Sequence, residues 1–191
     1  MKKKNTLVIS FMGVDGSGKT TLSKKLKNTL KQSKYLHLKP YILFQDRRRV
    51  VKKPHNQKKS KSFVSFLRLL SWIISYKVFF YRNKNFFFFI FDRYAHDILI
   101  DPLRYKHDLS KNLTNFLLNF FPKPDLWVFL NPSFKTIKSR KHELSDDDLR
   151  HQITLYSNFF KKEKNVLIIN TIVQSKISLT KIKKKVNFLN K

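Results

Sequence analysis

The residues most suited to chemistry in this 191-residue chain lie around its three glycines, which fall within six positions of one another. They belong to Gly13-Val14-Asp15-Gly16-Ser17-Gly18-Lys19-Thr20-Thr21, which fits the pattern G-x-x-x-x-G-K-[ST]. Only glycine adopts positive φ without a steric penalty and lets the backbone approach a ligand closely. In such a loop, free backbone N–H groups surround phosphates, the lysine reaches the β- and γ-phosphates and the next hydroxyl holds Mg²⁺. We therefore predict a nucleoside triphosphate site whose contacts come from Gly13, Asp15, Gly16, Ser17, Gly18, Lys19, Thr20 and Thr21.

A second group of chemically informative residues follows the apolar run Phe86–Phe91. Asp92 and Arg93 come directly after this run, and ligands of open parallel sheets bind outside the carboxyl ends of the strands. Asp92 is therefore predicted to hold Mg²⁺ together with Thr20, directly or through water. Arg93 offers a planar fork of donors that suits phosphate. The alternative is a simple salt bridge between Asp92 and Arg93 at the strand end.

A third group combines cations and acids in a short polar hinge. Arg140 and Lys141 precede Ser145, and Asp146–Asp148 follow it, which is typical of a capped helix start with acids at its positive end. The cap explains the acids but not the two cations. We predict a short lid over about residues 140–148 that closes on the phosphates being transferred and excludes water.

These residues require strands and helices in alternation to position them. Short runs that are apolar on both faces predict buried parallel strands, and an i, i+4 leucine pattern predicts the helix after the glycine loop. The resulting fold class is α/β: three α/β/α layers with a five-stranded parallel sheet and a short lid, in a single domain over 1–191. The expected strands are Leu7–Met12, Tyr35–Phe44, Phe86–Phe91, Leu126–Leu130 and Val166–Ile169. The expected helices are 19–33, 63–81, 112–121, 133–141, 146–164 and 175–188.

The charge of the chain is extreme, at +29 from 41 basic and 12 acidic residues. Eight of the cations lie between Arg47 and Lys61 in a segment without acids or periodicity, which predicts a basic loop inserted over about 46–62. Such a balance fits a polyanionic partner, and it equally fits a bias of composition toward Lys, Asn, Phe and Ile. The chain has no cysteine, so disulfides and thiolate metal sites are excluded.

No targeting or membrane segment is expected. The run Leu7–Met12 is too short for the apolar core of a signal peptide, and Arg68 and Lys77 interrupt the apolar stretch Phe63–Tyr81. We interpret the latter as a core helix and expect a cytoplasmic protein without a membrane partner.

Together, the three groups resemble the thymidylate-kinase-like branch of the nucleoside monophosphate kinases. The matching pieces are the glycine loop with its internal Asp15, Asp92-Arg93-Tyr94, Pro124-Asp125-Leu126 and Arg140-Lys141, in the family's order. The resemblance implies phosphoryl transfer from ATP, with Mg²⁺, to a nucleotide-like small-molecule acceptor. It implies catalytic roles for Lys19 on the donor, Asp15 facing the acceptor, Arg93 on the acceptor phosphate and Arg140 on the transferred group. A homodimer is expected by the same analogy alone.

The acceptor side departs from the family. The family's Arg-Glu-Pro-Gly signature after the second strand has only Leu38-Lys39-Pro40 as its counterpart, and the stretch after Tyr94 lacks the family's Ala-Tyr-Gln ending. Two alternatives therefore stay open. One is a kinase of a nucleoside or sugar hydroxyl, which benefits from a general base such as Asp15, Asp46 or Asp97. The other is a nucleic-acid-binding P-loop protein, suggested by the basic segment but without a recognition fold.

Overall fold

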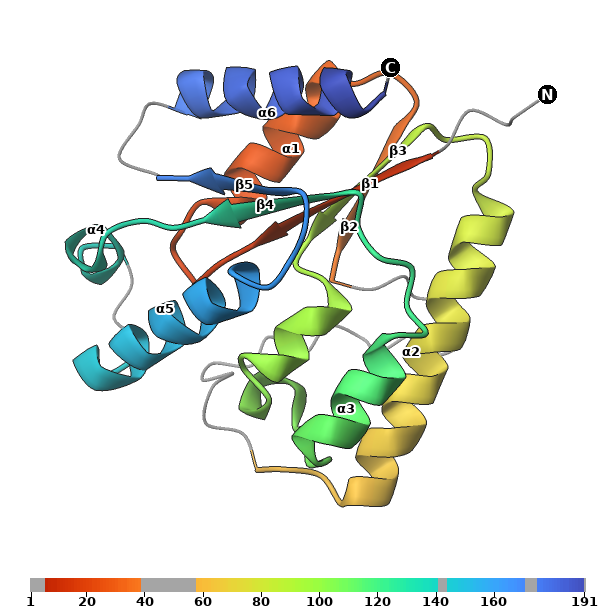
Figure 1. Ribbon diagram of the computed structural model, residues 1–191, viewed down its shortest axis with the longest axis vertical. Helices are drawn as coiled ribbons and strands as arrows, with labels where there is room; N and C mark the ends of the chain where they lie inside the picture. Colours follow the sequence, from red (N-terminus) through yellow and green to blue (C-terminus); the bar gives the residue numbers. More distant parts are fainter. Residues whose placement is uncertain (1–5, 39–57, 141–143, 171–174, 191) are drawn as a thin grey trace. The chain divides into compact units, whose positions relative to one another are not determined.

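The computed structural model describes residues 6–38, 58–140, 144–170 and 175–190 (Figure 1). Its chain forms two compact units. The first unit comprises Met1–His37, Asn85–Tyr94 and Pro124–Lys191, and the second comprises Leu38–Lys84 and Ala95–Lys123. The glycine loop, Asp92, Arg93 and Arg140 all belong to the first unit.

The first unit contains a five-stranded sheet in the order β2-β3-β1-β4-β5, with every neighbouring pair parallel. Helices cover both faces of this sheet: α1 and α6 pack together on one face, and α5 lies on the other (Figure 1). The predicted α/β three-layer fold with a five-stranded parallel sheet is therefore confirmed. The strands are β1 Leu7–Met12, β2 Ser33–His37, β3 Phe88–Asp92, β4 Leu126–Leu130 and β5 Val166–Ile169. The helices of this unit are α1 Lys19–Thr29, α4 Phe134–Lys138, α5 Asp146–Phe160 and α6 Ser175–Leu189.

The strands are apolar on both faces because each face has its own core. On one face, Ile9 and Phe11 of β1 pack with aliphatic residues of β4, α1 and α6 in a single buried cluster. On the other face, Phe129 of β4 stacks on Phe160 of α5 at 4.6 Å between ring centroids. The neighbouring Trp127 contacts the same ring edge-on at 5.9 Å. Successive side chains of each strand point to opposite faces and so pack into both cores. The carboxyl ends of the strands, which carry the predicted site, are thereby held between two packed layers.

The second unit is helical where the structure describes it, with α2 Ser62–Arg82, α3 Lys111–Leu118 and two short 3₁₀ helices, η2 Ala95–Leu99 and η3 Leu103–Tyr105. Trp72 of α2 packs edge-on against Tyr105 at 5.8 Å, and Arg68 donates a hydrogen bond of 2.6 Å to the Tyr105 carbonyl. By length and composition alone, α2 could cross a membrane. Its residues Leu69, Trp72 and Tyr76 are buried, whereas Phe63, Ile74 and Tyr81 are exposed, so the interpretation as a core helix stays a prediction.

A buried histidine also belongs to this unit. His96 of η2 is 6% exposed, and burial, followed by the charge of Lys123, lowers its pKa from 6.5 to about 4. The imidazole is therefore neutral at pH 7.

Element boundaries differ from the sequence predictions mainly where the backbone turns without glycine or proline. Helix α1 ends at Thr29, not near residue 33, because Leu30 is extended and Gln32 has a φ of 51°. Strand β2 consequently begins at Ser33 and ends at His37, and the rest of the predicted strand, from residue 39 on, lies outside the described residues. Helix α5 ends at Phe160 instead of 164, and the two 3₁₀ helices were not predicted. The bounds of β1, β4 and β5 match the prediction.

Candidate functional site

The glycine loop connects the end of β1 at Met12 to the start of α1 at Lys19. Gly13 has a φ of 142°, and a Cβ added there would lie 2.4 Å from the carbonyl oxygen of Leu130, the last residue of β4. Gly18 has a φ of 90° and no atom within 4 Å of its added Cβ, so only its backbone conformation requires glycine. Gly13 is thus needed for close contact between loop and sheet, and Gly18 for the left-handed turn that starts α1.

The first turn of α1 presents its N–H groups toward this loop. The helix begins at Lys19 with Gly18 as its N-cap residue, and within the described chain no side chain caps it. Uncapped N–H groups at a helix N-terminus, together with the positive end of the helix dipole, favour an anion. The loop and the helix start therefore have the backbone geometry of a phosphate site.

Lys19 lies across the loop. Its side chain is buried, and its Nζ donates hydrogen bonds to the Val14 carbonyl at 2.7 Å and to Ser17 Oγ at 3.4 Å. Asp15 Oδ1 is 3.8 Å from the same Nζ. The ammonium group is thus held over the concave side of the loop by the loop's own atoms, where it can exchange these partners for phosphate oxygens.

Asp92 lies at the end of β3 beside the loop, as predicted. Its side chain is buried, and its Oδ2 accepts a hydrogen bond of 2.5 Å from Thr20 Oγ1. Its Oδ1 is buried and has no hydrogen-bond partner among the described residues. Burial alone would raise the pKa of Asp92, but hydrogen bonds from His37 and Thr20 and the nearby positive charge of Lys19 hold that pKa below its ordinary value. The carboxylate is thus an anion whose Oδ2 accepts hydrogen bonds, whereas its Oδ1 has no partner within the part of the chain that the structure describes.

Arg93 makes an ion pair with Asp15 of the glycine loop. Its side chain is buried, its Nη1 lies 3.4 Å from the hydroxyl of Tyr156, and its backbone has a φ of 74°. The backbone N–H of Arg93 donates to the Phe11 carbonyl at 2.9 Å, which continues the pairing of β3 with β1 beyond the strand. A buried guanidinium is thereby fixed next to the loop.

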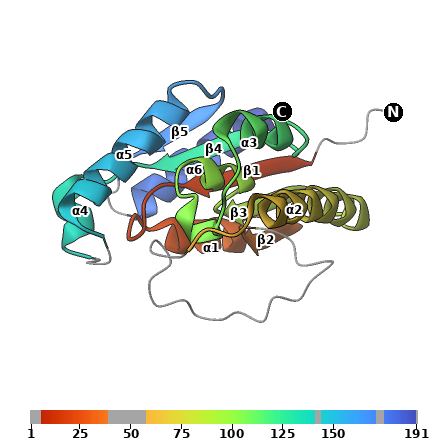
Figure 2. The ribbon, with the colours of Figure 1, turned by 90° about the horizontal axis from the view of Figure 1, so that it is seen from below.

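Arg140 also reaches the loop. It follows α4, its side chain is exposed, and its Nη1 donates to the Gly16 carbonyl at 3.4 Å. Ser145 caps α5 by accepting from the Asp148 N–H at 3.2 Å, as its sequence context predicted. Helices α4 and α5 lie side by side in both views (Figures 1 and 2), and Arg150 covers the ring of Phe134 at 4.1 Å. Lys141 lies outside the described residues, so the lid over 140–148 stays a prediction.

Three site residues were not found from the sequence. Tyr35 and His37 of β2 both contact Asp92, with Tyr35 OH 3.1 Å and His37 Nδ1 3.3 Å from Oδ2. Tyr156, from the middle of α5, contacts Arg93. The order of the sheet places β2 next to β3, and no pattern in the sequence signals that order. Tyr35 and His37 lie on one face of β2, but the sequence predicted a strand that begins at Tyr35, which placed them at its amino end.

Other candidates lie elsewhere. Asp97 is fully buried in the second unit and accepts a hydrogen bond of 2.6 Å from Tyr105 OH. Asp46 lies outside the described residues. Asp125 of the Pro-Asp-Leu stretch accepts a bond of 2.7 Å from the Val8 N–H and so joins the amino ends of β1 and β4, away from the loop. We therefore interpret the role of Asp125 as structural.

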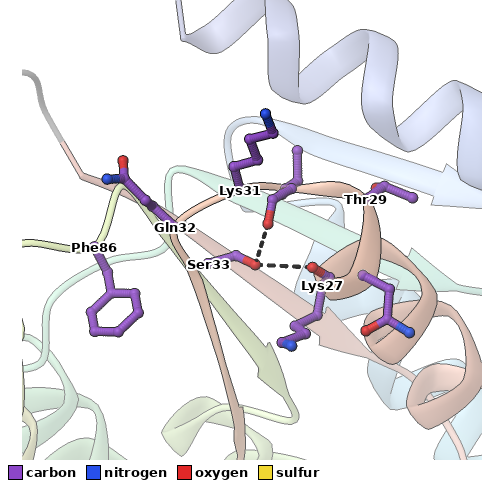
Figure 3. A pocket seen from close by; sticks show the side chains of 8 residues that line it. Lys27, Thr29, Lys31, Gln32, Ser33 and Phe86 are labelled. Carbon is purple, nitrogen blue, oxygen red and sulfur yellow. Dashed lines mark hydrogen bonds between the residues drawn. The ribbon is translucent and has the colours of Figure 1, made fainter.

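A shallow hollow of about 620 Å³ lies at the far end of α1 from the glycine loop (Figure 3). It is bordered by the last turn of α1, the start of β2 and Phe86 before β3. These are the amino ends of the strands, so the hollow is separate from the glycine loop. The side chains labelled in the figure are Lys27, Thr29, Lys31, Gln32, Ser33 and Phe86.

The parallel sheet with this loop after its first strand defines the fold of the P-loop kinases. No protein-family model matches the sequence, and no curated protein matches it. Among solved structures, the chain is similar to thymidylate kinase from Candida albicans, with 20% identity, a TM-score of 0.65 and coverage of 98% of this chain and 94% of the other. It is similar to thymidylate kinase from Ehrlichia chaffeensis at 15% identity and a TM-score of 0.63, covering 95% and 99%. It is also similar to deoxyadenosine kinase from M. mycoides with bound dATP, at 18% identity and a TM-score of 0.60, covering 95% and 100%. The predicted resemblance to thymidylate kinases is confirmed at the level of the fold.

Proposed function

We propose that this protein is a kinase that transfers a phosphoryl group from ATP to a nucleoside monophosphate or a similar phosphorylated small molecule. The observation that carries the proposal is the position of Asp15. Its Oδ1 lies 3.8 Å from Lys19 Nζ and also pairs with Arg93. One carboxylate thus joins the lysine of a triphosphate loop to a buried guanidinium suited to a second phosphate. Two adjacent phosphate sites are what a nucleotide-to-nucleotide transfer requires.

The donor side uses the loop residues. The N–H groups of the loop and of the first turn of α1 bind the phosphates of ATP, and Lys19 leaves the Val14 carbonyl to reach the β- and γ-phosphates. Gly13 and Gly18 permit this approach, and Asp15, Gly16, Ser17 and Thr21 complete the loop.

The residues around Thr20 fit Mg²⁺. This ion prefers oxygen ligands and keeps several waters, so one hydroxyl and one carboxylate suffice beside the phosphates. Thr20 Oγ1 supplies the hydroxyl, and Asp92 Oδ1 is a buried carboxylate oxygen without a hydrogen-bond partner in the described chain. No larger cluster of metal-binding side chains occurs among the residues that the structure describes, which agrees with a nucleotide-borne ion. When bound, Mg²⁺ would neutralise charge on the donor phosphates.

The acceptor side uses Arg93 and Asp15. Arg93 holds the acceptor phosphate, and Asp15 holds the guanidinium and faces the rest of the acceptor. Arg140, already in contact with the loop at Gly16, stabilises charge on the transferred group. No general base is required, because an acceptor phosphate is already an anion and alignment supplies most of the rate enhancement.

By analogy with the thymidylate kinases we also propose a single kinase domain, a lid over residues 140–148 and a homodimer. A cytoplasmic location fits a consumer of ATP and nucleotides. This mechanism assigns no role to the basic segment 46–62.

The proposal is tested by measuring ATP consumption with a panel of nucleoside monophosphates, nucleosides and sugars. We expect ADP release to rise with at least one monophosphate. In the Lys19→Ala variant that rate should fall roughly 100-fold or more, because removing one preorganised donor to the transition state typically has an effect of this size. Stimulation only by nucleosides or sugars would favour the hydroxyl-directed kinase, and Asp15→Asn and Asp97→Asn would then identify its base. No stimulation above the Lys19→Ala background with any acceptor would refute a small-molecule kinase.

A further inference from the structure

Strand β2 brings two polar side chains to the carboxylate at the end of β3. In the parallel pairing of these strands, Tyr35 lies opposite Ile90 and His37 opposite Asp92. Side chains two residues apart in a strand point to the same face, so Tyr35 and His37 lie on one face of the sheet. Tyr35 OH lies 3.1 Å and His37 Nδ1 3.3 Å from Asp92 Oδ2. The function proposed above does not use either residue.

Both contacts go to the oxygen that Thr20 already contacts. Thr20 Oγ1 donates to Oδ2 at 2.5 Å, so three groups from β2 and α1 surround this one atom. Oδ1 of the same carboxylate has no such partner in the described part of the chain, although it is buried. The two oxygens of Asp92 are therefore in very different environments.

This asymmetry matters because the terminal torsion of an aspartate is soft. The carboxylate plane of Asp has a broad, roughly two-fold torsional preference, so packing alone does not fix which way its oxygens point. Directional hydrogen bonds to one oxygen do fix it. When Thr20 gives its proton to Oδ2, its oxygen lone pairs remain available on the other side for a cation.

We propose that Tyr35 and His37 are positioning residues that hold the Asp92 carboxylate with Oδ1 toward the Mg²⁺ of a bound nucleotide. The inference rests on the proposed function. Outer hydrogen-bond partners of this kind commonly account for 10–100-fold in metal affinity or activity. Neither residue touches the nucleotide in this assignment, and each acts through Asp92.

The structure allows both contacts to be removed with little effect on packing. Tyr35 packs partly buried against the sheet core, so Tyr35→Phe keeps the ring and deletes only the hydroxyl. The side chain of His37 is 52% exposed, so His37→Ala removes little buried surface. His37→Asn places an amide donor near the position of Nδ1 and serves as the conservative variant. Tyr81→Phe is the matched control, because Tyr81 is 77% exposed in the second unit.

The experiment is calorimetric titration of ATP into each variant of the full-length chain, at several Mg²⁺ concentrations and in excess EDTA. We expect the Mg²⁺ concentration for half-maximal enhancement of ATP affinity to rise roughly 10-fold in Tyr35→Phe and in His37→Ala. The affinity in EDTA should stay unchanged, and His37→Asn should recover most of the loss. Tyr81→Phe should match the unmodified protein.

The possible failures are distinguishable. Unmodified protein that shows no Mg²⁺-dependent ATP binding would overturn the proposed function and this inference with it. Normal Mg²⁺ dependence in both Tyr35→Phe and His37→Ala would overturn the inference alone. Equal losses of ATP affinity with Mg²⁺ and in EDTA would also overturn it. Such losses would indicate a general distortion of the loop, which lowers ATP affinity whether or not Mg²⁺ is present.

Discussion

Replacing each of two loop glycines with alanine separates two physical reasons for glycine at this site. Gly13→Ala places a Cβ 2.4 Å from the Leu130 carbonyl oxygen and forces alanine to a φ of 142°. Gly18→Ala meets no atom within 4 Å and requires only a φ of 90°. The first variant therefore has both a steric conflict and an unfavourable backbone conformation, whereas the second has only the latter.

The magnitudes follow from this difference. A non-glycine residue in the left-handed region costs roughly 1–2 kcal/mol, which is the full expected loss of unfolding free energy for Gly18→Ala. In Gly13→Ala the contact is with backbone, which cannot rotate away, so the loop or the end of β4 must shift. Overpacking of this kind adds about 1–3 kcal/mol, for a total of roughly 2–5 kcal/mol. That is a large part of a typical stability of 5–15 kcal/mol.

The assay is urea denaturation of both variants without nucleotide, followed by circular dichroism and analysed as a two-state transition. We expect Gly13→Ala to lose clearly more unfolding free energy than Gly18→Ala. A loss in Gly13→Ala equal to or smaller than that in Gly18→Ala would show that the loop does not approach Leu130 as closely as described.

Two further predictions concern stability away from the glycine loop. The pKa of His96 is lowered from 6.5 to about 4 in the folded protein, so the unfolded chain binds more protons between these values. The stability contribution is therefore present above pH 6.5 and is lost as the pH falls toward 4, by up to about 3 kcal/mol. Denaturation midpoints of His96→Gln should accordingly depend less on pH over this window, and an unchanged dependence would contradict the burial of His96. Asp125→Ala leaves the Val8 N–H without its 2.7 Å acceptor and should cost about 1–3 kcal/mol in urea denaturation. Asp125→Asn, which keeps an acceptor, should cost less; equal costs would argue against this bond, and ATP affinity should stay unchanged in both variants.

The sequence determined the donor half of the candidate site. Three glycines, a lysine and a threonine form a local pattern whose chemistry depends on residues within nine positions of one another, and the structure places them in one loop as predicted. Asp92 was also predicted to meet Thr20, because the carboxyl ends of parallel strands lie at the same edge of a sheet. Apolar runs located β1, β4 and β5 for the same reason, since buried strands must be apolar on both faces.

The side chains that surround these groups depend on how distant parts of the chain pack together. Tyr35 and His37 reach Asp92 because β2 lies beside β3, and Tyr156 reaches Arg93 because α5 covers the face of the sheet that carries Phe129. Asp125 belongs to a stretch that matches the family, and the direction of β4 places it at the end of the sheet opposite to the glycine loop. Strand order and helix placement depend on contacts between residues far apart in the chain, and no local pattern records them. The glycine loop could therefore be identified from the sequence, whereas the residues that hold its partners Asp92 and Arg93 in place could not.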